Sequence, residues 1–259
     1  KDHLFYLASP ELINKYLQAF MKNLTSKVFR TFNASDLFEK ELNKISKKYE
    51  NYKQPRIVSV NVDVNIFPST RDVNASGEYV MINKTKEAID SIFLDHNSLI
   101  STFKFDKETD LVSEDTIYNL DIYKLGTPLY PGDSLKLSFS LKNKPNTVLR
   151  NNSQIIYNGT FINSSIFPSL GYSLGELRDD KTREKYDLPP NKLKPHPSDS
   201  TSLGNTYIAK DADWIDFEAT VSTSKDQIAI APGYLQKEWI EGDRRYFHYK
   251  MDSKILNFY

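Results

Sequence analysis

The sequence predicts a mainly β protein, an antiparallel β-sandwich or saddle-shaped curved sheet with a helical hairpin at its N-terminus. From residue 55 onward, apolar residues recur at every second position in several short runs. Turn signals such as Pro131-Gly132-Asp133 separate these runs. Before residue 54 the apolar residues instead recur with the 3.6-residue period of an amphipathic helix.

Residues 1–53 are expected to form a helical connector segment. Ser9 followed by Pro10 and Glu11 is typical of a helix start, and apolar stripes at helical spacing then run over 12–32 and 37–49. The segment holds 10 Lys or Arg against 6 Asp or Glu. Two alternatives remain open: a hairpin packed on the next domain with a solvated lysine face, which we favour, or a basic helix on a membrane surface.

Residues 54–259 are expected to form one β domain. Its expected strands are Val58–Ile66, Val73–Met81, Ile92–Leu94, Phe103–Phe105, Leu135–Leu141, Trp214–Val221, Gln227–Ala231 and Tyr246–Met251. The alternation vanishes over 173–205, which contain four of the twelve prolines. We expect a polar, Pro-rich insertion there, with one short helix over Glu176–Tyr186.

Composition excludes several kinds of chemistry. The chain has no cysteine, so disulfides, thiolate metal sites and cysteine nucleophiles are absent. None of the four histidines has another within four residues, so no H-E-x-x-H zinc helix exists, and Asp211, Asp213 and Asp216 lack calcium-loop spacing. The net charge of zero argues against a nucleic-acid partner. We therefore expect no catalytic residue, no metal ligand and no cofactor in this chain.

Seven Asn-x-Ser/Thr triplets occur, including those at Asn83, Asn158 and Asn163. In a secreted eukaryotic protein they would be glycosylation sites. The chain is rich in Asn, Ser and Thr, so we favour the interpretation that the triplets arise by chance from this composition. The aromatic residues fall mostly at strand positions, and we assign Trp214 to the core; a carbohydrate-binding sandwich is therefore the weaker interpretation.

Several stretches carry a family resemblance. They are Asp211-Ala-Asp-Trp-Ile-Asp-Phe-Glu-Ala-Thr-Val, Gln227-Ile-Ala-Ile-Ala-Pro-Gly-Tyr-Leu, Ala75-Ser-Gly-Glu-Tyr-Val-Met, Leu129-Tyr-Pro-Gly-Asp-Ser-Leu and Tyr157-Asn-Gly-Thr-Phe-Ile-Asn. Taken in their order along the chain, over about residues 55–259, these stretches resemble the N-terminal β domain of aminopeptidase N-like (gluzincin) zinc metallopeptidases. The sequence around Asn158, Pro168 and Gln227 is similar to the corresponding sequence in bacterial proteins that fuse an ABC transporter permease to such a peptidase.

The resemblance implies a non-catalytic domain fragment of a hydrolase. It places the H-E-x-x-H helix, the zinc and the Gly-x-Met-Glu-Asn strand in a catalytic domain beyond Tyr259, so this fragment is expected to cleave nothing. The family's N-terminal domain often lends one Gln or Glu to the substrate amine, but none lies between Tyr157 and Pro168. We do not transfer that role. Asn158 and Asn163 remain candidates for neutral, substrate-facing groups.

Two functions then compete. The chain is either the domain that shapes the substrate cleft and packs on the catalytic domain of a membrane-associated zinc aminopeptidase, or a binding and scaffold module of an ABC permease fusion without peptidase activity. The expected partners are the missing catalytic domain, a peptide substrate, the membrane through segments outside this chain, and an ABC ATPase. The expected location is the cell membrane, on its extracytoplasmic side.

Overall fold

The computed structural model describes residues 52–96, 100–115, 119–143, 155–171, 180–185 and 211–256, with isolated residues at 11, 14, 15, 18, 27, 190, 196 and 198–200. The chain divides into two compact units, residues 1–51 with 173–193 and residues 52–172 with 194–259. Helix α3 (Asp180–Lys185) belongs to the first unit and falls within the expected short helix. The predicted hairpin over 1–53 lies almost wholly outside the described residues.

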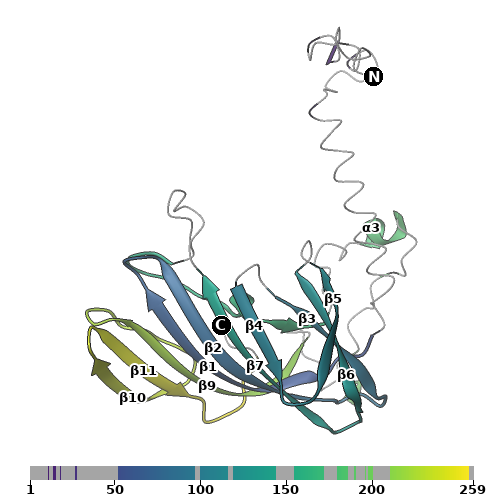
Figure 1. Ribbon diagram of the computed structural model, residues 1–259. Helices are drawn as coiled ribbons and strands as arrows, with labels where there is room; N and C mark the ends of the chain where they lie inside the picture. Colours follow the sequence, from purple (N-terminus) through teal and green to yellow (C-terminus); the bar gives the residue numbers. More distant parts are fainter. Residues whose placement is uncertain are drawn as a thin grey trace. The chain divides into compact units, whose positions relative to one another are not determined.

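The second unit is built from strands, which confirms the predicted mainly β class (Figure 1). The strands are β1 (Arg56–Phe67), β2 (Asp72–Ile82), β3 (Ile89–Asp95), β4 (Ile100–Phe105), β5 (Thr109–Asp115), β6 (Leu120–Leu129), β7 (Ser134–Asn143), β8 (Ser169–Leu170), β9 (Ala212–Ser224), β10 (Tyr234–Glu241) and β11 (Arg244–Lys250). A short 3₁₀ turn, η2 (Ser164–Ile166), precedes β8.

The described strands form two sheets. The larger has the order β10-β11-β9-β1-β2-β7-β4, and the smaller has the order β5-β6-β3-β8. Neighbours pair antiparallel, as the sequence predicts, except that β1 and β9 run parallel, with Val62 beside Ala219. This parallel pair joins strands about 150 residues apart, a pairing that local alternation does not reveal.

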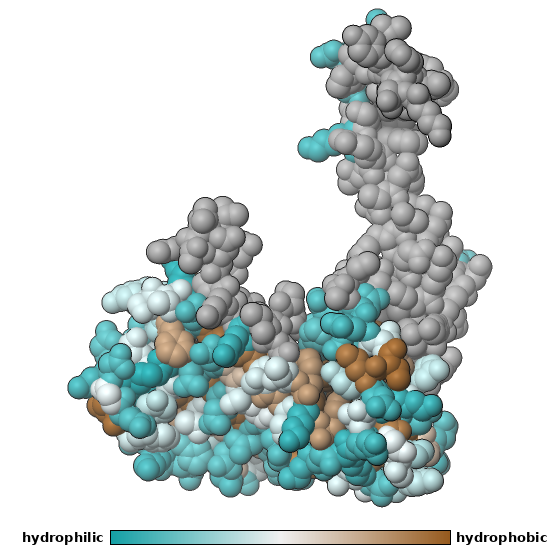
Figure 2. Space-filling model, viewed as in Figure 1, coloured by the Kyte–Doolittle hydropathy of each residue, from teal (hydrophilic) through white to brown (hydrophobic). Residues whose placement is uncertain are grey.

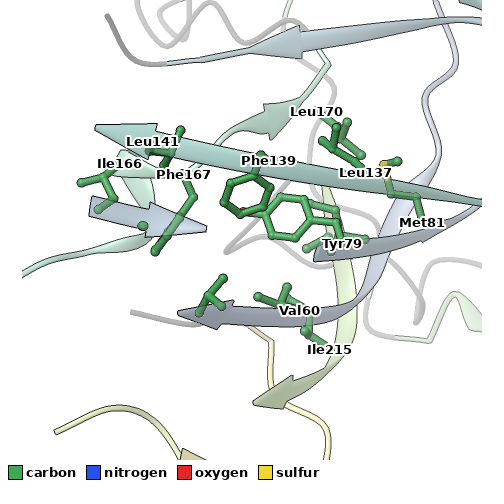
Figure 3. Close-up of a cluster of buried hydrophobic side chains, with 14 of the residues drawn as sticks. Val60, Tyr79, Met81, Leu137, Phe139, Leu141, Ile166, Phe167, Leu170 and Ile215 are labelled. Carbon is green, nitrogen blue, oxygen red and sulfur yellow. The ribbon is translucent and has the colours of Figure 1, made fainter. Parts of the chain in front are cut away.

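The core lies on the inner face of the larger sheet (Figure 3). Alternation along β1 and β2 places Val60, Tyr79 and Met81 inward, where they are almost fully buried. Phe139 of β7 stacks edge-on against the Tyr79 ring with centroids 4.9 Å apart. Apolar burial of this kind contributes about 1.5–3 kcal/mol per large side chain.

One glycine leaves room in this core for an aromatic ring and the backbone of a neighbouring strand. A Cβ on Gly77 of β2 would lie 2.7 Å from the Phe139 ring and 2.8 Å from the Asn61 carbonyl oxygen. Both distances are shorter than van der Waals contact, so a side chain here would displace the Phe139 ring and push the backbone of β1 away from β2.

Two expectations for the β domain are wrong in detail, and the alternation missed β5, β6 and β10. Gln227–Ala231 does not form a strand, and β10, which the alternation did not predict, follows it. β10 is exposed along most of both faces and therefore lacks the alternating pattern. Trp214 is 49% exposed rather than part of the core, because it occupies an outward-facing position of β9.

Candidate functional site

One pocket of about 850 Å³ opens on the inner face of the larger sheet. Its floor is the parallel pair, with Val62 and Val64 of β1 beside Ala219 and Val221 of β9. Two loops, 158–162 and 226–232, form its walls. A mainly apolar concavity of this size with a few polar groups is typical of a ligand or docking site.

Hydrogen bonds hold the first wall in shape. Thr160 Oγ1 accepts from the Ile156 amide at 3.0 Å and donates to the Ile156 carbonyl at 2.9 Å. The loop can close around Gly159 because its φ of +83° suits glycine. Thr160 is thereby committed to backbone contacts.

Gln227 joins the two walls. Its side-chain amide donates to the Tyr157 carbonyl at 2.6 Å and accepts from Thr223 Oγ1 at 3.1 Å. Further along the second wall, the Ala229 carbonyl accepts a hydrogen bond from Tyr249 Oη of β11 at 2.9 Å. The apolar side chains on the rim are therefore held on a fixed backbone.

The rim of the pocket is apolar and exposed. Phe161, Ile228 and Ile230 line the pocket while 73%, 68% and 83% of their respective surfaces stay exposed. Monomeric proteins rarely leave such side chains together in water. Figure 2, which shows one side of the molecule, has brown apolar areas between hydrophilic ones.

The two predicted substrate-facing residues have different positions. Asn158 lies in the pocket wall, and its side chain makes no hydrogen bond to another described residue. Asn163 instead caps η2, where its Oδ1 accepts from the Ser165 amide at 3.1 Å and from the Ser165 hydroxyl. Neither position tests the substrate-facing role, which stays a prediction for both.

A group of acidic side chains lies away from the pocket, where β9 begins. Burial raises the pKa of Asp211, whose carboxylate accepts from the Leu170 amide at 3.1 Å. Burial also opposes ionisation of Asp213, but hydrogen bonds from Lys84 and the Trp214 amide hold its pKa below the usual range. These contacts tie the start of β9 to its neighbours, so the group has a structural role.

Asp95 belongs to the same region. Burial raises its pKa to about 6, with His96 opposing the shift and Asp211 adding to it. Asp216, by contrast, is exposed and pairs with Lys254 at 3.1 Å. Among the residues that the structure describes, no three His, Asp or Glu side chains converge on a metal position.

The sequence motifs missed most of the pocket. The alternation predicts a strand for Gln227 and Ile230, and Phe161 falls in the motif that the family resemblance places at the approach to the catalytic face. Their signal was present, since Ile228 and Ile230 alternate with Ala229 and Ala231 beside a turn at Pro232-Gly233. Only the fold shows that the larger residues point outward and the alanines inward.

Comparisons with known proteins point in two directions. Residues 1–99 match the family described as eukaryotic DNA topoisomerase I, catalytic core. The DNA topoisomerase 1 proteins of Candidozyma auris and Candida albicans are each 49% identical, over 45 and 41 residues. Those stretches are 17% and 16% of this chain and span only 6% and 5% of the two relatives.

The match to solved structures covers more of the chain. An M1 zinc metallopeptidase from Deinococcus radiodurans aligns with a TM-score of 0.47 at 13% identity, over 79% of this chain and 40% of that one. A two-domain M1 zinc metallopeptidase, the E323A mutant bound to L-tryptophan, also has a TM-score of 0.47, at 13% identity, over 79% and 41% of the two chains. Legionella pneumophila aminopeptidase A aligns with a TM-score of 0.44 at 8% identity, over 81% and 21%.

Neither comparison assigns the chain to a family. The topoisomerase match covers fewer than half of the 259 residues, over the expected connector and the first strands of the β domain. The chain spans about 40% of the Deinococcus peptidase chain, and similarity at these identities concerns the fold alone. Among the described residues, no helix is long and apolar enough to cross a membrane.

Proposed function

We propose that residues 54–259 are the non-catalytic N-terminal β domain of a zinc aminopeptidase-like protein, packing on a catalytic domain encoded beyond residue 259. The observation that carries this proposal is the exposed apolar rim of Phe161, Ile228 and Ile230 around the pocket. The ordered motifs that resemble this family support it, because two of them form the two pocket walls.

The pocket suits a domain interface because its shape is fixed before docking. Gln227 and Tyr249 hold the second wall, so an incoming apolar surface meets side chains on an already ordered backbone. Ordering a loop on binding would cost free energy, and a preformed rim avoids that cost. The side-chain amide of Asn158, which bonds to no other described residue, would then lie at the edge of the cleft between the two domains.

The chemistry would belong to the catalytic domain. Zinc held there would activate a water molecule for attack on the first peptide bond of a substrate. In this proposal the present chain contributes shape and contacts. The ABC permease fusion is proposed on the sequence motifs alone. The extracytoplasmic location is a further part of the proposal, and no motif in the chain specifies it.

The first experiment is to sequence the reading frame of the parent gene past the codon for Tyr259. A Gly-x-Met-Glu-Asn motif followed by H-E-x-x-H and a later Glu would support the proposal. A frame that ends there, or continues without those residues, would refute the peptidase assignment.

The second experiment tests the rim in the parent protein. Ile228→Glu with Ile230→Glu should separate the domains, so thermal unfolding should show two transitions and aminopeptidase turnover should fall roughly tenfold or more. Leu111→Glu with Val112→Glu is the matched control, because both residues are exposed and apolar but lie on β5, outside the pocket. Equal effects of the two double variants would show that the rim is not the interface.

A further inference from the structure

Strand β10 is the outermost described strand of the larger sheet, and β11 is its one described neighbour (Figure 1). Seven of its eight residues are exposed, among them Tyr234, Leu235 and Ile240. No proline interrupts it. An exposed edge of this kind is a template for pairing with another strand.

The hairpin geometry shows which backbone groups of β10 face outward. Gly242-Asp243 forms a two-residue turn with φ of +60° at the glycine, and Glu241 lies opposite Arg244. Residues that flank such a turn form a hydrogen-bonded pair, and these pairs alternate along an antiparallel ladder. Glu241, Trp239 and Lys237 therefore direct their backbone groups toward β11. The N–H and C=O groups of Glu238 and Ile240 point to the open edge.

We propose that β10 pairs antiparallel with β10 of a second copy of this chain, around a two-fold axis at Trp239. In this register, Glu238 exchanges backbone hydrogen bonds with Ile240 of the partner subunit. Ile240 does the same with Glu238 of the partner subunit. Lys237 lies opposite Glu241 of the partner subunit, and the same contact repeats on the other side of the axis. The two copies would thereby extend one sheet into the next.

The side chains favour this register over its neighbours. Lys237, Trp239 and Glu241 share one face of β10, where the Lys237 ammonium lies 5.0 Å from the centre of the Trp239 ring. Moving the axis to Glu238 would place that carboxylate opposite Glu238 of the partner subunit. Moving it to Ile240 would place Glu241 opposite Trp239 of the partner subunit, and Lys237 would lie opposite Asp243 of the partner subunit, which is in the hairpin turn and outside the strand. The axis at Trp239 gives two opposite-charge pairs and no like-charge pair directly opposite.

The same charges limit β10 to this partner. Charged residues on an edge strand normally prevent pairing with other chains. Here Lys237 and Glu241 are complementary to themselves under two-fold symmetry, so they admit a second copy and reject strands of other charge patterns. The register irregularity between Leu235 and Lys237 ends the regular stretch, so pairing covers only Lys237–Glu241. A short pairing region predicts a weak, reversible dimer.

The test is sedimentation velocity on the full 259-residue chain over a wide range of concentrations. The wild-type chain should dimerise as concentration rises. Lys237→Glu and Glu241→Lys should each weaken the dimer by roughly tenfold or more, because each replaces two attractive pairs by two repulsive ones. Lys142→Glu makes the same charge change on an exposed residue of β7 and should leave the dimer unchanged.

Mixing the two single variants gives the decisive result. A Lys237→Glu chain beside a Glu241→Lys chain restores both opposite-charge pairs, so the mixture should form a heterodimer as tight as the wild-type dimer. Recovery in the mixture also shows that both variants are folded. A wild-type chain that stays monomeric, or single variants that do not recover when mixed, would overturn the proposal.

A cysteine scan tests the register independently, because the chain has no cysteine of its own. Trp239→Cys should form an interchain disulfide, since non-hydrogen-bonded residues directly opposite one another have Cα atoms about 4.5 Å apart. Glu238→Cys and Ile240→Cys should not cross-link to themselves. Cross-linking at either of these positions instead of 239 would refute the register.

Discussion

Replacing the buried amide of Asn83 with alanine should destabilise the β domain substantially. Asn83 follows β2 and is 1% exposed. Its Nδ2 donates to the carbonyls of Leu129 at 2.7 Å and Glu87 at 2.8 Å. Its Oδ1 accepts from the amide and hydroxyl of Thr85 at 2.9 and 2.7 Å. One side chain therefore holds the β2–β3 loop against the end of β6.

The size of the loss follows from which partners water can reach. The Leu129 carbonyl is buried, so losing its donor costs about 1–3 kcal/mol. Thr85 and Glu87 lie near the surface and recover water, so losing those bonds costs about 0.5 kcal/mol each. The total for Asn83→Ala is about 3 kcal/mol, and at a urea dependence of about 2 kcal/mol per molar the midpoint falls by about 1.5 M.

Urea unfolding followed by circular dichroism measures this shift. Asn61→Ala is the matched control, because Asn61 is exposed on β1, and it should change stability by less than about 0.5 kcal/mol. A loss below about 1 kcal/mol for Asn83→Ala, at an unchanged slope, would refute the argument. The same burial predicts that Asn83, although it lies in an Asn-x-Thr triplet, carries no glycan in the folded domain.

Two further predictions concern charge and backbone geometry. Because burial raises the pKa of Asp95 to about 6, its contribution to stability is present below the unfolded value near 3.9 and is lost as pH rises through about 6. Asp95→Asn should therefore stabilise the domain at pH 7.5 by about 1 kcal/mol relative to wild type, after allowing for partial exposure, and by little at pH 4; equal effects at both values would contradict this. Gly233→Ala should cost about 2 kcal/mol or more, because φ is +107° and the new Cβ would lie 2.6 Å from the Lys250 carbonyl carbon. Gly132→Ala, with a φ of +89° and open space around it, separates the backbone strain from the clash, and an equal loss for both variants would show that the clash contributes nothing.

The sequence by itself determined the fold class and most of the inner face of the sheet. Val60, Val62 and Val64 alternate with polar residues, and a one-residue shift would bury the polar set, so the pattern admits one orientation. The turn at Pro131-Gly132-Asp133 likewise indicated where β7 begins.

Only the tertiary structure decided the pocket and the place of β10 at the edge of the larger sheet, as far as the described strands extend. The pocket exists because β1 and β9 pair in parallel across about 150 residues, and local periodicity carries no information about such distant pairing. β10 escaped prediction because a strand exposed on both faces has no buried side to impose an alternation. Trp214 was assigned to the core from its residue type, but position along β9 decides which side chains turn inward, and that position turns outward.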